Sequence, residues 1–281
     1  LASDAKTLGC LTPGPELLKQ LMLQPLGPTP LRVCAGGSTS RCAGDGCWTV
    51  DLRRHREIHY DADSRDIQIG PGLSMAEILQ ALRPHGRSVP MGLSGLTGSG
   101  FILTGGMGPL SRSQGLALDS ITAIEGIWGS GESFVLQNDQ TTKDGRHWRA
   151  LLGAAPFLAV VTSLRLRTQR LQALRVRHGL IAPSQLPELL RIAEGWPETC
   201  SLQWSWGDRL EVYAVDSSSE QPTPQTLKEL DPILGTGHNA LIQSCTDQLE
   251  LPIFGRLASE TSESIPVHNE VTARLGPALG G

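Results

Sequence analysis

The segment from Gly92 to Gly108 combines many glycines with large apolar side chains. Seven of its seventeen residues are glycine, and Leu93, Leu96 and Phe101 stand between them. Flexible linkers pair glycine with serine rather than with large apolar residues. Ordering glycine costs more backbone entropy than ordering any other residue, so the segment needs a surface to pack on. We predict an ordered loop that a large flat ligand helps to hold; a set of ordinary turns is the alternative.

A second glycine pair, Gly36-Gly37, follows a short apolar run that is typical of a strand and precedes Ser38-Thr39-Ser40. Successive backbone amides in such a turn can point into one concavity and bind an anion, although most such pairs are plain turns. The two common nucleotide signatures are absent: the chain has no G-x-x-x-x-G-K-[ST], and residue 103, where a third glycine would follow Gly98-Ser-Gly100, is leucine. A standard Rossmann site is therefore excluded.

Hydrophobic periodicity and turn residues predict a mixed α+β chain. Ser74 followed by Glu77 is the pattern of a capping box, and Pro84 and Gly86 end the helix that it starts. Strands are predicted at 30–34, 48–52, 58–60, 66–70, 121–128, 133–136, 157–166, 171–180, 200–206 and 210–215, and helical segments at 17–26, 148–152, 184–194 and 224–230. The pattern changes after about residue 168, which indicates a second domain.

Composition excludes several classes of protein. The net charge is −4 over 281 residues, and Phe and Tyr together number only six, so neither phosphate-backbone binding nor base stacking is expected. No apolar run is long enough to span a membrane. The six cysteines form no C-x-x-C pair or zinc pattern, so buried thiols and no metal site are expected. No signal peptide is recognisable, and we expect a cytoplasmic protein.

Six short motifs follow one another between residues 29 and 168. They are Cys34-Ala-Gly-Gly-Ser-Thr39; Val50-Asp-Leu52; Gly70-Pro-Gly72 with Gly86-Arg-Ser-Val-Pro90; Thr104-Gly-Gly-Met-Gly-Pro-Leu-Ser-Arg112; Gly115-Leu-Ala-Leu-Asp-Ser-Ile121; and Trp148-Arg-Ala-Leu-Leu-Gly153 with Val160-Val-Thr162. In this order they resemble the FAD-binding domain of the vanillyl-alcohol-oxidase (PCMH-type) flavoproteins, and most of all the berberine-bridge-enzyme-like oxidoreductases.

The resemblance implies a two-subdomain PCMH-type FAD-binding domain and assigns residues to the cofactor. Cys34, Ala35, Gly36, Gly37, Ser38 and Thr39 would surround the pyrophosphate, with the amides of the last four neutralising it. Ser94, Thr97, Gly98 and Gly100 would lie along the diphosphate and ribityl chain, Gly105 and Gly106 would let the backbone pass close to the flavin, and Val161 would meet the adenine edge. No catalytic residue can be assigned.

Four positions depart from the family's pattern. Ser38 and Ser94 stand where members carry the His and Cys that attach the flavin covalently, so the resemblance implies FAD that is held noncovalently. Cys34 replaces an arginine and removes a fixed charge. Ala159 adds a methyl group where the family has glycine, which is either neutral or weakens binding.

The resemblance divides the chain into an FAD-binding domain at 1–168 and a smaller α+β substrate domain with an antiparallel sheet at 169–281. The second part is shorter than in family members, so we expect it to be either truncated or incomplete, and the Tyr-x-Asn base of the family cannot be carried over. Gln203, Ser205, Glu211 and Tyr213 lie on predicted strands and would form the substrate wall. Tyr213 as a proton acceptor is weighed against simple packing of its ring on the sheet.

The function that follows is an FAD-dependent oxidoreductase that oxidises an alcohol or a hydroxy-acid-like small molecule. One alternative is a degenerate flavoprotein fold that acts as a binding or assembly subunit without catalysis. Another is a UDP-sugar reductase, which would need an NADPH-facing domain that is not recognisable. The expected partner is a small-molecule substrate, with no nucleic acid and no membrane span; the substrate and the oligomeric state are not predicted.

Overall fold

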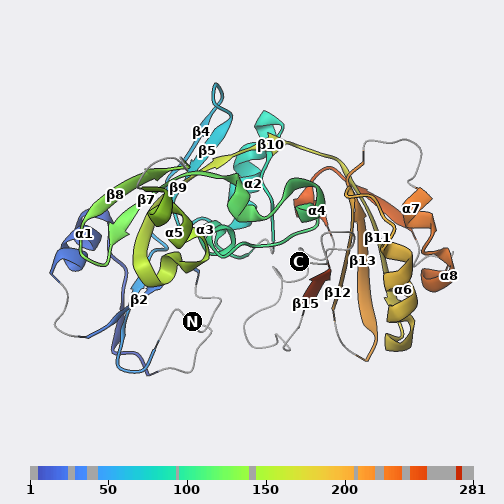
Figure 1. Ribbon diagram of the computed structural model, residues 1–281, viewed down its shortest axis with the longest axis horizontal. Helices are drawn as coiled ribbons and strands as arrows, with labels where there is room; N and C mark the ends of the chain where they lie inside the picture. The colour runs from blue at the N-terminus through green and yellow to red at the C-terminus, as the bar shows by residue number, and fades with distance from the viewer. Residues whose placement is uncertain are drawn as a thin grey trace. The chain divides into compact units, whose positions relative to one another are not determined.

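The computed structural model (Figure 1) describes residues 6–24, 29–36, 44–92, 95–138, 144–205, 208–218, 225–235, 241–251 and 270–273. The chain divides into two compact units. Unit 1 comprises Leu1–Val89, Gly95–Gly106 and Ala117–Gln169, and unit 2 comprises Pro90–Ser94, Met107–Leu116 and Arg170–Gly281. The glycine-rich segment is therefore shared between the two units.

Unit 1 contains a small parallel sheet, in the order β1-β3-β2, made of β1 (Gly9–Leu11), β2 (Leu31–Cys34) and β3 (Trp48–Asp51). Helix α1 (Pro15–Leu23) connects the first two strands and begins with proline, whose missing N–H costs nothing at the first position of a helix. Its buried face, Leu18 and Leu21, packs with Val50, Leu52, Ile127 and Val160. These contacts join the small sheet to the larger one.

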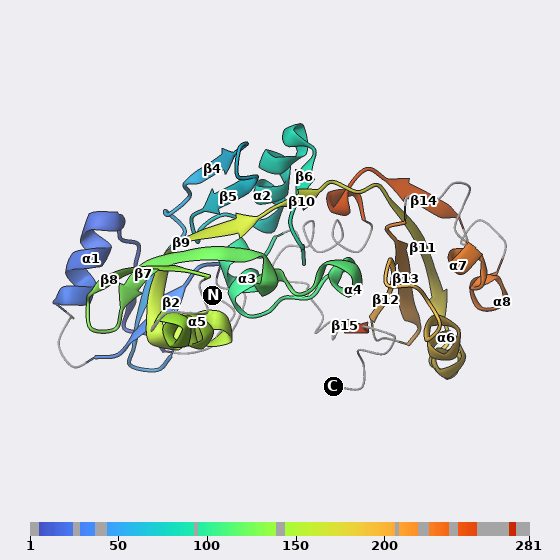
Figure 2. The ribbon, with the colours of Figure 1, turned by 45° about the horizontal axis from the view of Figure 1, so that its top comes forward.

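The larger sheet of unit 1 is antiparallel, in the order β4-β5-β9-β7-β8 (Figure 2). Its strands are β4 (Ile58–Asp61), β5 (Asp66–Ile69), β9 (Ala159–Arg167), β7 (Ile121–Trp128) and β8 (Ser133–Gln137). The strand predicted to begin at residue 157 begins at Ala159 instead. Phe157 and Leu158 belong to the end of helix α5 (Asp144–Leu158), which kinks at Gly153, where φ is +93°. The apolar run therefore spans a helix end and a strand start, which periodicity alone does not separate.

Helix α2 (Met75–Leu82) begins with the predicted capping box. The Ser74 hydroxyl accepts a hydrogen bond from the Glu77 amide at 3.3 Å, and the Glu77 carboxylate accepts one from the Ser74 amide at 2.9 Å. That backbone N–H holds the pKa of Glu77 below its usual value. The predicted apolar face is buried, and the helix passes through Arg83–His85 to Gly86, whose φ of +62° ends it. Beyond it, β6 (Arg87–Ser88) pairs with β10 (Gln169–Arg170).

The glycine-rich segment is not the loop that the sequence predicts, because Gly98–Leu103 form helix α3. A Cβ at Gly98 would lie 2.3 Å from Cδ1 of Ile78 on α2, and one at Gly106 would lie 2.3 Å from the ring of Phe101. Distances this short leave no space for a methyl group. These two glycines let the protein's own side chains pack closely, so part of the segment is ordered without a ligand.

Unit 2 is built on an antiparallel sheet with strand order β14-β11-β13-β12-β15. The strands are β11 (Leu174–Ile181), β12 (Cys200–Ser205), β13 (Leu210–Asp216), β14 (Ile242–Cys245) and β15 (Glu270–Ala273). Helices α6 (Leu186–Ala193), α7 (Gln225–Lys228) and α8 (Asp231–Leu234) lie along one face (Figure 1), where Leu189 and Leu227 pack against Val212 and Ala214. The predicted α+β class is confirmed.

The short helix α4 (Ser111–Gln114) also belongs to unit 2. Arg112 on this helix is 7% exposed and donates hydrogen bonds to the carbonyl oxygens of Cys200 at 2.8 Å and Trp196 at 3.0 Å. An arginine that satisfies two buried carbonyls is expensive to remove. It ties the segment Met107–Leu116 to the sheet of unit 2 across more than eighty residues of chain.

Arg177 joins the sheet of unit 2 to α7 and α8. Its side chain is 1% exposed, and it donates hydrogen bonds to the carbonyl oxygens of Leu227 at 2.5 Å and Gly235 at 2.7 Å. Its guanidinium also pairs with the half-exposed carboxylate of Asp231 at 2.7 Å. The sheet therefore holds both helices through one buried cation.

Replacing Arg177 by leucine is expected to lower the free energy of unfolding of unit 2 by about 3 kcal/mol, because two carbonyls and a carboxylate lose their donor. Urea unfolding followed by the fluorescence of the core tryptophans Trp196 and Trp204 measures the change. Arg191→Leu, at an exposed position of α6, serves as the control and is expected to stay within about 0.5 kcal/mol. Equal urea midpoints for the two variants would contradict the role assigned to Arg177.

Candidate functional site

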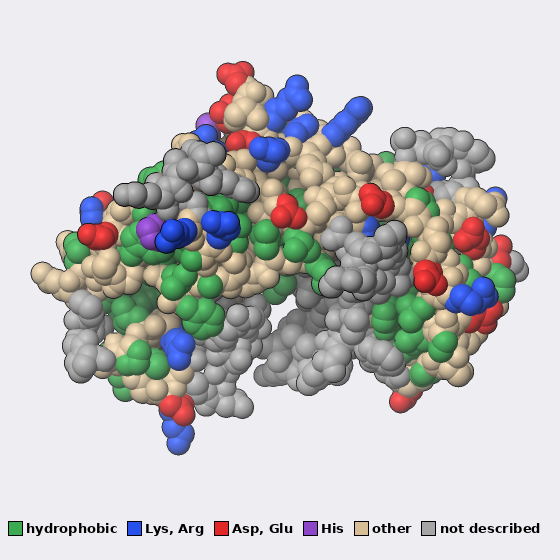
Figure 3. Space-filling model, in the orientation of Figure 1, with side chains coloured by type: hydrophobic (Ala, Val, Ile, Leu, Met, Phe, Trp, Pro, Cys, Tyr) green, Lys and Arg blue, Asp and Glu red, His purple; other side chains and the backbone are tan. Residues whose placement is uncertain are grey.

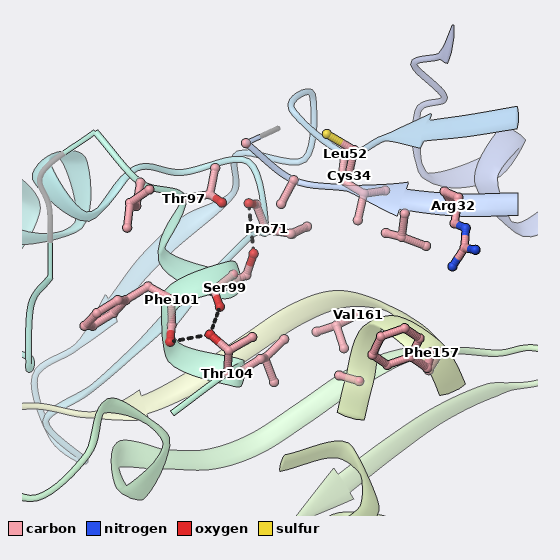
Figure 4. A pocket seen from close by; sticks show the side chains of 18 of the residues that line it. Arg32, Cys34, Leu52, Pro71, Thr97, Ser99, Phe101, Thr104, Phe157 and Val161 are labelled. Atoms are coloured by element: carbon pink, nitrogen blue, oxygen red, sulfur yellow. Dashed lines mark hydrogen bonds between the residues drawn. The ribbon is translucent and has the colours of Figure 1, made fainter. Parts of the chain in front are cut away.

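Unit 1 contains a cavity of about 350 Å³ that lies between β2, α3 and the junction of α5 with β9 (Figure 4). Its lining residues come from segments far apart in the sequence. They are Leu31, Arg32, Val33, Cys34, Ala35, Gly36, Leu52, Pro71, Leu96, Thr97, Ser99, Gly100, Phe101, Leu103, Thr104, Ala155, Phe157, Ala159 and Val161. Pockets of this size, mostly apolar with a few polar groups, are typical of sites for small molecules and cofactors.

Strand β2 leads the chain into the cavity and ends at Cys34, after which Ala35 and Gly36 continue along its wall. At Gly36 the backbone passes close to Thr97, the residue before α3. A Cβ at residue 36 would lie 2.8 Å from Cγ2 and 3.0 Å from Oγ1 of Thr97. Only glycine allows this close approach of the two segments.

Helix α3 forms the opposite wall, and its hydroxyl groups are engaged in hydrogen bonds to the backbone. Ser99 donates to the carbonyl oxygen of Pro71 at 3.1 Å, and Thr104 donates to that of Gly100 at 2.7 Å (Figure 4). These bonds hold the helix in place between the two ends of the cavity. Gly100 is exposed and lines the cavity, and a Cβ at this residue would make a close contact of 3.3 Å with Oγ1 of Thr97.

The cavity is electrically neutral apart from one side chain. Arg32 is the single charged residue among the described residues that line it. The apolar lining comes from the aromatic Phe101 and Phe157 and from aliphatic side chains such as Val161. Such a lining suits a ligand that has a flat or apolar body.

Six of the thirteen residues predicted to bind the cofactor line this cavity: Cys34, Ala35, Gly36, Thr97, Gly100 and Val161. Gly98, Gly105 and Gly106 are not among the lining residues; Gly98 and Gly106 pack against the protein itself, and Gly105 has a φ of +76°. Gly37, Ser38, Thr39 and Ser94 lie outside the described residues. Contact of these thirteen residues with a cofactor stays a prediction.

Sequence reasoning missed Arg32, Phe157 and Thr104 as lining residues. A signal for Arg32 was present, because residues two apart on a strand share a face and Arg32 lies two residues before Cys34. Phe157 was assigned to a buried strand, whereas it ends α5 with a side chain that is 62% exposed. Ala159, the departure from the family's glycine, also lines the cavity.

Unit 2 carries polar side chains on the sheet face that its helices leave uncovered. Tyr213 pairs in register with Gln203 on one side and His178 on the other. The rings of His178 and Tyr213 stack, with centroids 4.5 Å apart and planes 13° apart, and Nε2 of His178 lies 2.9 Å from Oε1 of Glu211. Tyr213 is buried, which agrees with packing of its ring on the sheet. The His178–Glu211 pair was not foreseen from the sequence.

A groove of about 540 Å³ borders His178 in the same unit. It is lined by Val176, His178, Gly179, Leu180, Leu241, Ile242 and Gln243. Near the sheet centre, Oγ of Ser201 and Oε1 of Gln203 are buried and have no hydrogen-bond partner within the described part of the chain. Ser205, the fourth residue of the predicted wall, pairs in register with Glu211.

The cysteines contribute no reactive thiolate in unit 2. Burial raises the pKa of Cys200 to about 12 and that of Cys245 to about 11, so both thiols stay protonated at neutral pH. Cys34 and Cys47 are also buried, while Cys10 is exposed, contrary to the expectation of buried thiols; Cys42 lies outside the described residues.

Within the residues that the structure describes, no three His, Cys, Asp or Glu side chains come together as a metal site. No helix in this part of the chain has the length and apolar character needed to cross a membrane. On the face seen in Figure 3, acidic and basic side chains stand next to one another at the end formed by the β4–β5 hairpin. Opposite charges offset each other there.

Comparison with known proteins gives one family match. Residues 28–137 match the profile of a family described as FAD binding domain. The FAD-linked oxidoreductase janO of Penicillium janthinellum is 29% identical over 186 residues, which are 63% of this chain and 37% of that protein. (R)-6-hydroxynicotine oxidase of Paenarthrobacter nicotinovorans is 28% identical over 128 residues, 45% of this chain and 27% of that protein. The chain spans only about a third of the length of the curated relatives that it matches.

Solved structures share the fold. Xylooligosaccharide oxidase from Myceliophthora thermophila C1, in complex with xylobiose, superposes with a TM-score of 0.75 at 20% identity, over 91% of this chain and 57% of that one. BBE-like 1 of Physcomitrella patens superposes with a TM-score of 0.69 at 16% identity, over 78% of this chain and 50% of that one. Residues 28–137 therefore match an FAD-binding domain, and the shared fold agrees with the resemblance to flavoproteins of the vanillyl-alcohol-oxidase (PCMH) type that the motifs predict.

Proposed function

We propose that this chain binds FAD noncovalently in the cavity of unit 1 and is part of an FAD-dependent oxidoreductase that oxidises an alcohol or a hydroxy acid. The observation that carries the proposal is that three separate segments predicted from motifs, around Cys34, Thr97 and Val161, line one cavity. A set of unrelated turns has no reason to converge in this way. The names of the relatives, which are FAD-linked oxidoreductases, support the same cofactor.

The residues present fit a flat dinucleotide. A Cβ at Gly36 would clash with the side chain of Thr97, so glycine lets residues 34–36 and Thr97 line the cavity next to one another. Gly100 leaves the α3 wall open, and the apolar lining suits planar rings. Bound FAD would supply hydride acceptance, and the protein would position the substrate and its proton acceptor.

Unit 2, proposed as the substrate domain, carries a histidine paired with a carboxylate beside its groove, since Nε2 of His178 lies 2.9 Å from Oε1 of Glu211. The adjoining groove is mainly apolar, so we propose an apolar substrate that carries a hydroxyl group.

The cofactor proposal predicts a yellow protein with absorbance near 450 nm after reconstitution with FAD. Acid denaturation is expected to release all of the flavin into the supernatant, because serine replaces both attachment residues. Anaerobic addition of hydroxyl-bearing substrates is expected to bleach this absorbance, while the matched methyl ethers are expected to leave it unchanged.

Each step of this experiment has an outcome against the proposal. Flavin that remains with the precipitated protein would show covalent attachment. A colourless protein that FAD does not reconstitute would favour a flavoprotein fold that serves as a binding or assembly subunit. Binding without bleaching by any alcohol or hydroxy acid would contradict the proposed substrate class alone.

A further inference from the structure

Phe157 is an exposed aromatic side chain at one end of the cavity. It lies in the last turn of α5 with 62% of its surface exposed, although it lines the cavity. Leaving a large apolar ring in water is unfavourable, and an aromatic face beside a cavity is well suited to stack on a planar ligand. The ring is thus available to a ligand rather than used in the core.

Arg32 enters the same end of the cavity from β2 (Figure 4). Its neighbours on the strand, Leu31 and Val33, pack against the cluster around α1 and also line the cavity. Arg32 is exposed, and it makes no ion pair with any described residue. Its guanidinium is planar and weakly hydrated, and it stacks on aromatic rings as well as pairing with anions.

The two side chains together select for a planar, electron-rich ring. An anion alone would gain nothing from Phe157, and a purely apolar group would gain nothing from the charge of Arg32. FAD has two flat ring systems. The attraction of a cation for a ring face grows with the electron density of that face, and adenine is electron-rich whereas oxidised isoalloxazine is an electron acceptor. The adenine ring is therefore the better occupant.

We infer that Arg32 and Phe157 hold the adenine ring of the dinucleotide between a guanidinium plane and a phenyl ring. This inference rests on the proposed binding of FAD in the same cavity. It also supplies a reason why the chain tolerates Cys34, since part of the affinity comes from stacking and not from a charge at residue 34.

Isothermal titration of the full chain with FAD, ADP and FMN tests the inference. Arg32→Met and Phe157→Leu are each expected to lower the affinities for FAD and ADP about tenfold, which is the typical contribution of one base stack. The affinity for FMN is expected to stay unchanged, because FMN has no adenine. Phe157→Tyr is expected to bind like the wild type. Arg146→Met, at an exposed position of α5 outside the cavity lining, is the matched control and is expected to change nothing.

Arg32→Lys separates stacking from simple charge. Lysine keeps the positive charge but lacks the planar guanidinium group, so Arg32→Lys is expected to show most of the tenfold loss of ADP affinity that Arg32→Met shows. An ADP affinity equal to that of the wild type in Arg32→Lys would overturn the stacking role. ADP affinities within twofold of wild type in both Arg32→Met and Phe157→Leu would also overturn the inference, as would a loss confined to FMN. A wild type that binds neither FAD nor ADP would instead contradict the proposed function, and the inference with it.

Discussion

Replacing Gly100 by tryptophan is expected to abolish FAD binding while unit 1 stays folded. Gly100 lies on α3, is exposed and lines the cavity, and its Cβ would lie 3.3 Å from Oγ1 of Thr97. A large side chain at this residue would occupy part of the proposed ligand site. Glycine is the weakest of the non-proline helix formers, so its replacement gains up to about 1 kcal/mol of helix stability.

The expected loss of FAD affinity is at least about 100-fold, since a ligand that meets a filled cavity must displace the new side chain. A series of Gly100→Ala, Gly100→Leu and Gly100→Trp is expected to show a loss that grows with side-chain volume. Titration with FAD measures the affinity, and circular dichroism with a melting curve reports the fold. Lys19→Trp places the same ring on the exposed face of α1 as a control. Wild-type affinity in Gly100→Trp would show that FAD binds elsewhere.

Gly108→Ala is expected to destabilise unit 2 by about 3 kcal/mol or more. A Cβ at residue 108 would lie 1.8 Å from the carbonyl oxygen of Met91, which is far inside the contact distance of two atoms. The partner is backbone, so no side-chain rotation relieves the clash. Gly108 also donates its amide hydrogen to Oγ of Ser111 at 2.9 Å, and any shift of the chain weakens this bond.

Chemical unfolding followed by tryptophan fluorescence measures this effect. Gly195→Ala is the matched control in the same unit, because nothing lies within 4 Å of its new Cβ, and it is expected to be neutral or slightly stabilising. Both variants remove one glycine and add one methyl group, so the difference between them isolates the clash. Similar midpoints would contradict the packing of Met107–Leu116 against Pro90–Met91.

Local interactions made much of the fold predictable. The Ser74–Glu77 capping box and the hairpin of β4 and β5 depend on residues that are close in the sequence, and the structure confirms both. The order of the short motifs sufficed to recognise the FAD-binding domain that residues 28–137 match. The start of β9 was predicted wrongly because the apolar residues 157–162 fit a helix end and a strand equally well.

The amino-acid sequence thus determined the capping box of α2, the β4–β5 hairpin and the motifs of an FAD-binding domain at residues 28–137, because each depends on neighbouring residues and their spacing. It did not reveal that Gly98 is reserved for the side chain of Ile78, that Arg32 and Phe157 enter one cavity, or that His178 meets Glu211. These facts depend on contacts between residues that are 20 to 125 positions apart. Such contacts exist only after the chain has folded, when packing and burial select which side chains meet.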